Sequence, residues 1–338
     1  MSKLRIGLIG VGRHGARYAN HLKHDPLGAE LVAIARRDAV AAAEQAREYG
    51  CRAYHDWREL VAAPDVDAVI AVVPPTLHRE IVRAAVTERK PLLLEKPAAP
   101  NLAHGREMLS LVKQNNLPVM VAQTLRYNGV VRQFMEALPQ IGAIHALRLG
   151  QRFEPSRPGW IDDPAIAGGG MVLHTGVHCF DLVRFLSGLE VERVSCEVSQ
   201  VRVKRTEDNF AAVLRLSDHT TLATVAGSRA TGSRSGGVEI AGERGQLIGD
   251  HVLNWAAIVT GSQVQQLSVP PPVPTVREVV REFVRAIQAG EPVPIPLEEG
   301  LRAVAIVEAC YEAAARQQSV SVADLTAKHP GGPTMGRE

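Results

Sequence analysis

The feature that most restricts how this chain can fold is a glycine-rich turn at residues 10–15. The pattern G-x-G-x-x-G is met by Gly10, Gly12, Arg13, His14 and Gly15. The turn lies between the apolar run 6–9 and a segment with helical spacing of apolar residues, which is the context that a dinucleotide-binding turn requires. The first glycine permits the tight turn, the second lets a pyrophosphate approach the backbone, and the third lets helix and strand pack closely. The free N–H groups of the helix N-terminus favour phosphate. We therefore predict a Rossmann-type cofactor site.

Strand and helix patterns alternate through residue 122. The run 68–73, AVIAVV, is apolar on every position and stops at Pro74 and Pro75. Runs of this kind are typical of strands buried on both faces of a parallel sheet. Alternating strands and helices imply right-handed crossovers. The sequence thus predicts an α/β domain over residues 1–122 with a doubly wound parallel sheet.

The pattern changes to period two after residue 122. The segments 194–198, 210–216 and 222–224 alternate apolar with polar residues and are separated by glycine-rich turns. Such alternation is typical of an antiparallel sheet with one apolar face. We expect a second domain over residues 123–328, with helices at about 276–289 and 299–316, and a frayed tail over residues 329–338.

Composition excludes several classes of protein. The 338 residues hold 38 Lys and Arg against 36 Asp and Glu, spread along the chain, so no basic stripe for nucleic acid is present. No apolar run approaches the roughly 20 residues that span a bilayer. The four cysteines form no C-x-x-C pair. We expect a cytoplasmic protein with reduced thiols, without nucleic-acid or membrane partners.

The end of the second predicted strand bears on the choice of cofactor. NAD enzymes carry an acidic residue about 20 positions after the turn, where it binds the ribose 2′-hydroxyl. Here Arg36 and Arg37 stand in that region, followed by Asp38. A guanidinium matches a 2′-phosphate in charge and geometry. The sequence favours NADP(H), with NAD(H) possible if Asp38 reaches the ribose.

Two segments carry candidate catalytic groups. Lys96 follows Glu95 at the end of a buried strand, where open α/β sheets place ligands. His174, His178 and Asp181 are spaced i, i+4, i+7 on a predicted helix, opposite its apolar face. We expect that face to be a site or a solvated surface. Lys96 and His178 can supply the cation and the base that oxidation of a hydroxyl group needs.

Together these motifs resemble the glucose–fructose oxidoreductase / inositol dehydrogenase / MocA (Gfo/Idh/MocA) family. They are the glycine turn, residues 74–78 (PPTLH), residues 95–97 (EKP), and Gly168–Gly170 leading to His178 and Asp181. The resemblance implies a second α/β domain with a large open sheet, reversible NAD(P)-linked oxidation of a sugar, polyol or related hydroxyl compound, and homodimers or homotetramers formed through that sheet. It also implies that Lys96 contacts substrate and nicotinamide and that His178 is the acid/base.

One departure from the family pattern concerns the substrate. Members commonly carry an aspartate four residues before the catalytic histidine, and this chain carries His174 there. An imidazole in place of a carboxylate changes the coupling to the pKa of His178. The outcomes left open are another substrate, including a carboxylated or diol-bearing ring, or His174 itself as the base.

Further candidates and rival functions complete the prediction. Pro74, His78 and Glu95 are candidate cofactor contacts, with a structural cap left open for His78. Arg126, Tyr127 and Trp160 are candidate substrate contacts, Trp160 by stacking on a sugar ring. One rival is a metal site at His174 and His178, for which no third ligand can be named; our prediction is no metal. The other is a non-catalytic cofactor-binding sensor of the same fold.

Overall fold

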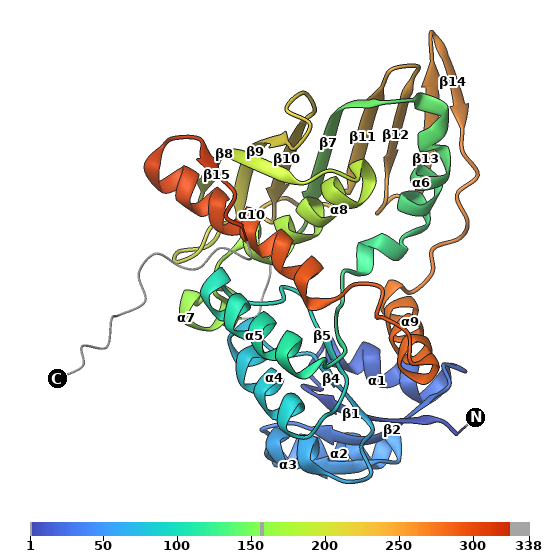
Figure 1. The fold of residues 1–338 in the computed structure, drawn as a ribbon, viewed down its shortest axis with the longest axis vertical. Helices are drawn as coiled ribbons and strands as arrows, with labels where there is room; N and C mark the ends of the chain where they lie inside the picture. Colours follow the sequence, from blue (N-terminus) through green and yellow to red (C-terminus); the bar gives the residue numbers. More distant parts are fainter. Residues whose placement is uncertain (1, 156–158, 325–338) are drawn as a thin grey trace, which may run out of the picture.

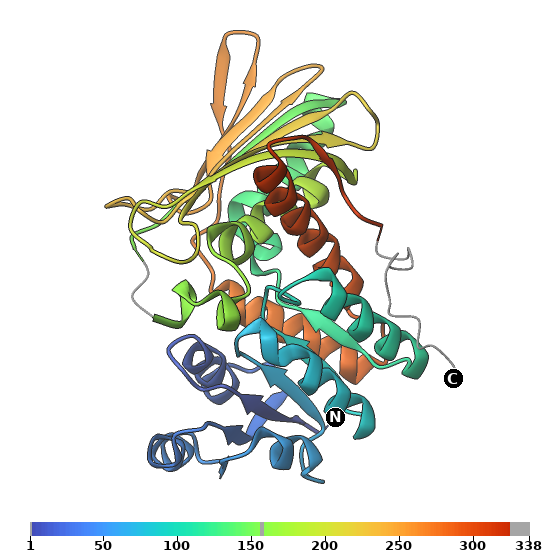
Figure 2. The same cartoon turned by 90° about the vertical axis from the view of Figure 1, so that its left-hand side faces the viewer.

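The computed structural model describes residues 2–155 and 159–324. Two sheets dominate it, one at each end of the molecule, with helices between and around them (Figures 1 and 2). The predicted tail over residues 329–338 lies outside the described residues. No helix within the described ranges is both long and apolar enough to cross a membrane. All four cysteines are free.

The first sheet has six parallel strands in the order β3-β2-β1-β4-β5-β6, which confirms the predicted doubly wound sheet. Its strands are β1 Leu4–Ile9, β2 Ala29–Ala35, β3 Arg52–Tyr54, β4 Ala68–Ala71, β5 Leu92–Leu94 and β6 Val119–Val121. The helices that alternate with them are α1 Gly15–His24, α2 Ala39–Tyr49, α3 Trp57–Ala62, α4 His78–Thr87 and α5 Leu102–Asn115. The strand order reverses between β1 and β4, and such a switch point is where α/β sheets bind ligands.

The second sheet has nine strands in the order β14-β13-β12-β11-β7-β10-β9-β8-β15. Only β7 and β10 run parallel to each other, so the predicted open, mostly antiparallel sheet is confirmed. The strands are β7 Ile144–Arg152, β8 Val191–Ser199, β9 Asn209–Leu216, β10 Leu222–Ser228, β11 Gly237–Gly242, β12 Gln246–Asp250, β13 Trp255–Thr260, β14 Gln263–Gln266 and β15 Val320–Ser321.

Helices cover one face of the second sheet (Figure 2). They are α6 Gly129–Ile141, α8 Val177–Ser187 and α10 Leu297–Arg316, with the short α7 Pro164–Ala167 nearer the first sheet. The buried face of β9 shows why. Phe210, Ala212, Leu214 and Leu216 point inward, while Ala211 and Val213 between them are exposed. The period-two pattern therefore encodes a one-sided core, as predicted.

The domain boundary is less simple than the predicted division at residue 122. Helix α9, Thr275–Ala289, buries Val279, Phe283 and neighbouring residues in the core of the first sheet. The N-terminal part of α10 joins the same core through Leu297 and Leu301, whereas its C-terminal part packs on the second sheet. The amphipathic pattern predicts these helices but does not tell which sheet an apolar stripe covers. Helix α9 and the start of α10 therefore belong to the core of the first sheet, although they follow β7–β14 of the second sheet in the sequence.

Candidate active site

The glycine turn after β1 has the geometry that a pyrophosphate needs. Gly10 has φ +89°, in the region that favours glycine, and its N–H donates to Ala35 O at 2.9 Å. A side chain at Gly15 would collide with the Gly10 carbonyl, whereas a Cβ at Gly12 would meet nothing within 4 Å. The side chain of His14, which precedes α1, makes no capping bond with it. Open backbone at Gly12 and uncapped N–H groups fit a dinucleotide phosphate.

His14 and Glu95 bind each other instead of both facing a cofactor. His14 Nε2 lies 2.7 Å from Glu95 Oε1, and the Tyr18 hydroxyl donates to the same oxygen at 2.5 Å. Burial alone would raise the pKa of Glu95, but contacts with His14, Lys96 and Tyr18 outweigh it and lower the pKa to about 2. Because Glu95 is only 5% exposed, it acts as an anionic anchor that ties the glycine turn to the end of β5. Its predicted cofactor contact is therefore indirect.

The arginines at the end of β2 lie as their spacing predicts. Arg36 Nη1 donates to Val11 O at 3.2 Å and to Gln45 Oε1 at 3.0 Å, so its guanidinium is held beside the glycine turn. Arg37 is exposed. Asp38 is the N-cap of α2 and accepts from Ala41 N at 3.1 Å. The carboxylate that was the alternative ribose ligand is thus engaged in capping.

His78, a candidate cofactor contact with a structural cap as the alternative, lies inside the fold. His78 is fully buried, and its Nδ1 lies 3.0 Å from Ala98 O. Burial lowers its pKa, so the neutral ring is a structural link between α4 and the segment after Lys96. Pro74 is half-buried ahead of the 3₁₀ turn Pro75–Leu77 and stays a candidate.

The three glycines before the histidines are required by close packing. A side chain at Gly168, Gly169 or Gly170 would collide with Pro100, Tyr311 or Glu207 respectively. Glu207 accepts from Val172 N at 2.9 Å and from the Tyr311 hydroxyl at 2.8 Å. These bonds fix the start of the site helix, by which we mean the helical segment 172–187 that carries His174 and His178. Nothing local in the sequence marks Glu207 or Tyr311, which lie far along the chain from this loop.

The site helix departs from the predicted α-helix. Residues Val172–Gly176 form a π-helical turn before α8, and such turns are frequent at functional sites. Of the two outcomes expected for the polar face, a site or a solvated surface, the second does not hold, because His174 is 9% exposed and Asp181 is 1% exposed. The predicted apolar face, which includes Val172, Cys179 and Leu186, is confirmed as buried.

Lys96 reaches this turn from the first sheet. Its Nζ donates to His174 O at 2.9 Å. Burial lowers the pKa of Lys96, and the Glu95 charge opposes that shift. His178, at the start of α8, is partly exposed and has an Nδ1 that is buried without a hydrogen-bond partner. Burial and then the Lys96 charge hold the pKa of His178 well below its usual value, so the imidazole is neutral near pH 7.

His174 occupies a different environment from His178. Its Nε2 lies 3.0 Å from Ala167 O, so that nitrogen carries the proton. Burial and the Lys96 charge lower its pKa to about 3. The Trp160 ring contacts it edge to face, with centroids 5.8 Å apart, and is 39% exposed. The Nε2 proton of His174 is thus held by the backbone, whereas Nδ1 of His178 has no hydrogen-bond partner.

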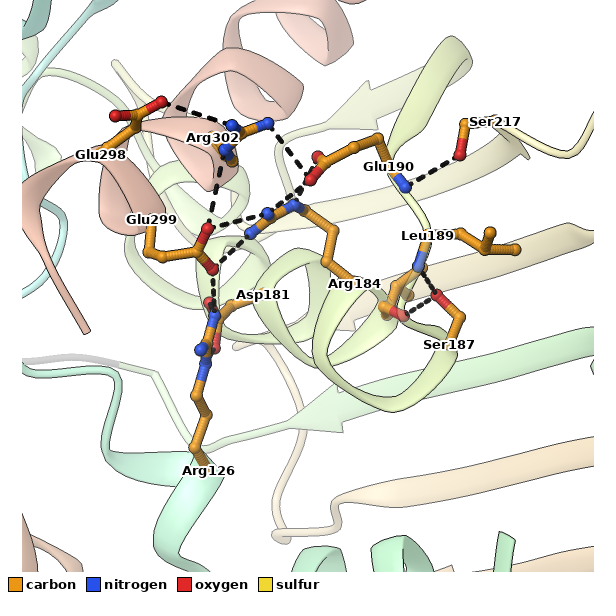
Figure 3. A network of polar contacts seen from close by, with 11 residues as sticks. Arg126, Asp181, Arg184, Ser187, Leu189, Glu190, Ser217, Glu298, Glu299 and Arg302 are labelled. Carbon is orange, nitrogen blue, oxygen red and sulfur yellow. Dashed lines mark hydrogen bonds and ion pairs between the residues drawn. The ribbon is translucent and has the colours of Figure 1, made fainter. Parts of the chain in front are cut away.

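Arg126 and Tyr127 are not placed for direct substrate contact. Arg126 donates to both oxygens of Asp181, at 2.8 and 2.6 Å, and to Glu299 at 2.9 Å. Figure 3 shows that Arg184 and Arg302 extend this network through Glu299 and Glu190. Tyr127 is 7% exposed, and burial raises its pKa to about 12. Sequence spacing reveals neither the ion pairs that Arg126 makes with distant elements nor the burial of Tyr127.

No cluster of three metal-ligating side chains occurs among the residues that the structure describes. The metal alternative therefore gains no third ligand near His174 and His178.

The fold and the site together define a nicotinamide-nucleotide-dependent oxidoreductase, with a glycine-rich turn at one sheet and a lysine and a histidine at the junction of the two.

Comparison with known proteins shows to which family of oxidoreductases this chain belongs. Residues 4–123 match the oxidoreductase family with an NAD-binding Rossmann fold, and residues 137–248 match the GFO/IDH/MocA C-terminal domain. The chain belongs to the Gfo/Idh/MocA family, and it is accordingly an oxidoreductase acting on CH–OH groups.

Relatives of full length support this assignment. The chain is 26% identical to a myo-inositol 2-dehydrogenase of Thermotoga maritima, over 95% of this chain and 99% of that protein. It is 28% identical to a dTDP-3,4-didehydro-2,6-dideoxy-alpha-D-glucose 3-reductase of Saccharopolyspora spinosa, over 92% and 97%. Among solved structures, a probable dehydrogenase from Thermotoga maritima has 26% identity and a TM-score of 0.81, covering 94% of this chain and 99% of its own. Levoglucosan dehydrogenase in complex with NADH and L-sorbose shares the fold, with 24% identity, a TM-score of 0.87 and coverage of 96% and 100%.

Proposed function

We propose that this protein transfers a hydride between C4 of a nicotinamide cofactor and a hydroxyl-bearing carbon of a sugar, polyol or cyclic diol. The observation that carries the proposal is the position of Lys96, whose Nζ donates to His174 O beside the helix that carries His178 and whose charge lowers the pKa of that histidine. Relatives named for inositol and for a deoxysugar support the substrate class.

The chemistry divides between the two side chains. The bound nicotinamide supplies the hydride acceptor. His178, neutral at pH 7, takes the hydroxyl proton of the substrate as the C–H bond breaks and the carbonyl forms. The Lys96 ammonium keeps N–H groups beyond the one given to His174 O, and these stabilise the negative charge that develops on the substrate oxygen. In reduction the same two groups act in reverse.

We assign His174 and Trp160 to shaping the site. The ring of His174 fixes the π-helical turn through Ala167 O, and its backbone carbonyl holds Lys96. The exposed part of Trp160 offers a flat apolar surface to a sugar ring.

The experiment that tests the function measures initial rates of cofactor reduction with a panel of neutral sugars, polyols and cyclic diols. At least one member, myo-inositol among the first to be tried, is expected to be oxidised in a reaction that needs NAD⁺ or NADP⁺. Tight binding of NADPH without turnover of any panel member would support the sensor alternative instead.

The finer cofactor proposal is a preference for NADP(H). Arg36 is held beside the turn, Arg37 is exposed, and Asp38 is occupied as a helix cap. Replacing Arg36 and Arg37 by alanine is expected to raise KM for NADP⁺ by roughly tenfold or more, because charge-assisted bonds to phosphate are lost. KM for NAD⁺ should change little. A tenfold preference of the unmodified protein for NAD⁺ in kcat/KM would overturn the proposal.

We also propose that two or four copies associate through the open sheet. Within the described residues, the face of this sheet away from the helices exposes Val213 and Leu222 and carries a groove lined by Arg148 and Glu239. Exposed apolar side chains on an open sheet face are the kind of surface that such an association buries. Light scattering of Val213→Glu against the unmodified chain checks this, and an unchanged mass would oppose it.

A further inference from the structure

Two glutamines near the catalytic pair keep polar atoms that have no partner. Both amide atoms of Gln123 and the amide oxygen of Gln151 are buried without a hydrogen bond. Gln123 is 1% exposed and Gln151 is 3% exposed. A buried polar group left unpaired costs about 1–3 kcal/mol, so most buried groups in proteins are paired. Polar groups that lack a partner beside a catalytic site indicate that a ligand supplies the missing hydrogen bonds.

Gln123 lies at the end of the first sheet beside Lys96. It follows β6, where Ala122 N donates to Leu94 O at 2.9 Å and so aligns the end of β6 with the end of β5. The segment Glu95–Lys96 continues from that same end of β5. Gln123 and Lys96 therefore follow two neighbouring strands, β6 and β5, at the same edge of the sheet.

Gln151 lies in the second sheet and faces the site helix. In β7 it shares the inward row with Leu147 and Leu149, which are core residues packed with α8. Arg152, which follows it, points to the opposite face, where it lines the outer groove. A neutral amide at the end of an apolar row suits a neutral ligand group.

His251 holds the Gln151 amide in place. Gln151 Nε2 donates to His251 Nε2 at 3.2 Å, which leaves Gln151 Oε1 as a free acceptor. The imidazole packs on Gly236, where any side chain would collide with it. Asp250 accepts from Gly236 N, Val252 N and Leu253 N and so fixes the turn that carries His251. This part of the site is therefore preorganised without a ligand.

We infer that Gln123 and the Gln151–His251 pair form a subsite that hydrogen-bonds hydroxyl groups of the substrate away from the carbon that is oxidised. This inference rests on the proposed function and deepens it. The groups offer amide donors and acceptors and a neutral imidazole, and no uncommitted charge. Because the two amides and the His251 imidazole carry no charge, the subsite favours neutral vicinal hydroxyls over a carboxylate.

The test replaces each glutamine by methionine, which has a similar length and no hydrogen-bonding amide. For Gln123→Met and Gln151→Met, the Tm of the ligand-free protein is expected to stay the same or rise, since unpaired buried polar groups are removed. With myo-inositol as the probe, KM is expected to rise by roughly tenfold, the value of one lost hydrogen bond. The Kd of NADPH should not change.

Gln200→Met is the comparison variant. Its amide lies at the surface and is satisfied, donating to Thr206 O at 2.6 Å, so this change should leave both KM for myo-inositol and Tm nearly unchanged. A Tm that falls in Gln123→Met and Gln151→Met, or an unchanged KM, would overturn the subsite. If myo-inositol is neither oxidised by the unmodified protein nor raises its Tm, the proposed function fails for this probe. The ligand-free Tm comparison then still tests the subsite separately.

Discussion

Replacing Lys96 by methionine is expected to lower kcat by about 10²–10³-fold, the effect of removing one donor that stabilises an oxyanion. The Lys96 ammonium lies at the end of β5 and donates to His174 O at 2.9 Å, beside the helix that carries His178. Steady-state rates with the substrate found in the panel, together with the Kd of NADPH from fluorescence, measure the effect. The loss should fall on kcat far more than on NADPH binding.

Lys23→Met is the matched control, since Lys23 Nζ also donates to a backbone carbonyl, Tyr49 O, at 2.8 Å, but far from the histidines. It should retain full kcat. Equal losses in both variants, or full activity of Lys96→Met, would remove Lys96 from the mechanism. The variant also tests His178 through the pH profile. Because the Lys96 charge helps to lower the pKa of His178, its removal should raise that pKa. The acid limb of the residual kcat/KM should therefore move to higher pH.

The parts of the fold that sequence predicts well are those encoded locally. Each glycine at 10, 12 and 15 has a role set by its own backbone and nearest neighbours, so the turn could be assigned from its pattern. The inward row of β9 likewise follows from period two alone. The candidate pair Lys96 and His178 was found because both follow recognisable local signals: a strand end and a glycine-led helix.

The parts that sequence misses depend on contacts between distant segments. The polar spacing of His174, His178 and Asp181 left both a site and a solvated surface open. The structure buries Asp181 against Arg126, 55 residues earlier, and His174 in a π-helical turn. Helix α9 shows an apolar stripe, but the pattern cannot tell that it covers the first sheet. The amides of Gln123 and Gln151 can be recognised as candidate ligand contacts only when their burial and their lack of hydrogen-bond partners are known.

Replacing Arg126 by alanine is expected to destabilise the protein by about 3–5 kcal/mol, the typical effect of removing one partner of a buried ion pair. The Asp181 carboxylate, 1% exposed, would lose both of its bonds from the guanidinium, and Glu299 would keep only Arg184 and Arg302 (Figure 3). Denaturant unfolding at pH 7 measures the loss. Arg83→Ala, which removes an exposed pair with Glu107, should change stability by less than about 1 kcal/mol. Equal effects of the two changes would contradict the role of the network.

The gap in the free energy of unfolding between Arg126→Ala and the unmodified protein should become smaller as pH falls. Burial alone would raise the pKa of Glu299, but bonds from Arg184 and Arg126 outweigh it and lower the pKa to about 2. A lowered carboxyl pKa stabilises the fold above the usual value near 4.5, and this stability is lost as pH falls from there toward 2. Burial already raises the pKa of Asp181, and without Arg126 it should rise further. The folded variant would then bind a proton more readily than the unfolded chain, so acid stabilises it relative to neutral pH. Unfolding at pH 7, 5 and 4 tests this, and a gap that stays constant or widens toward pH 4 would show that the ion network does not stabilise the site helix.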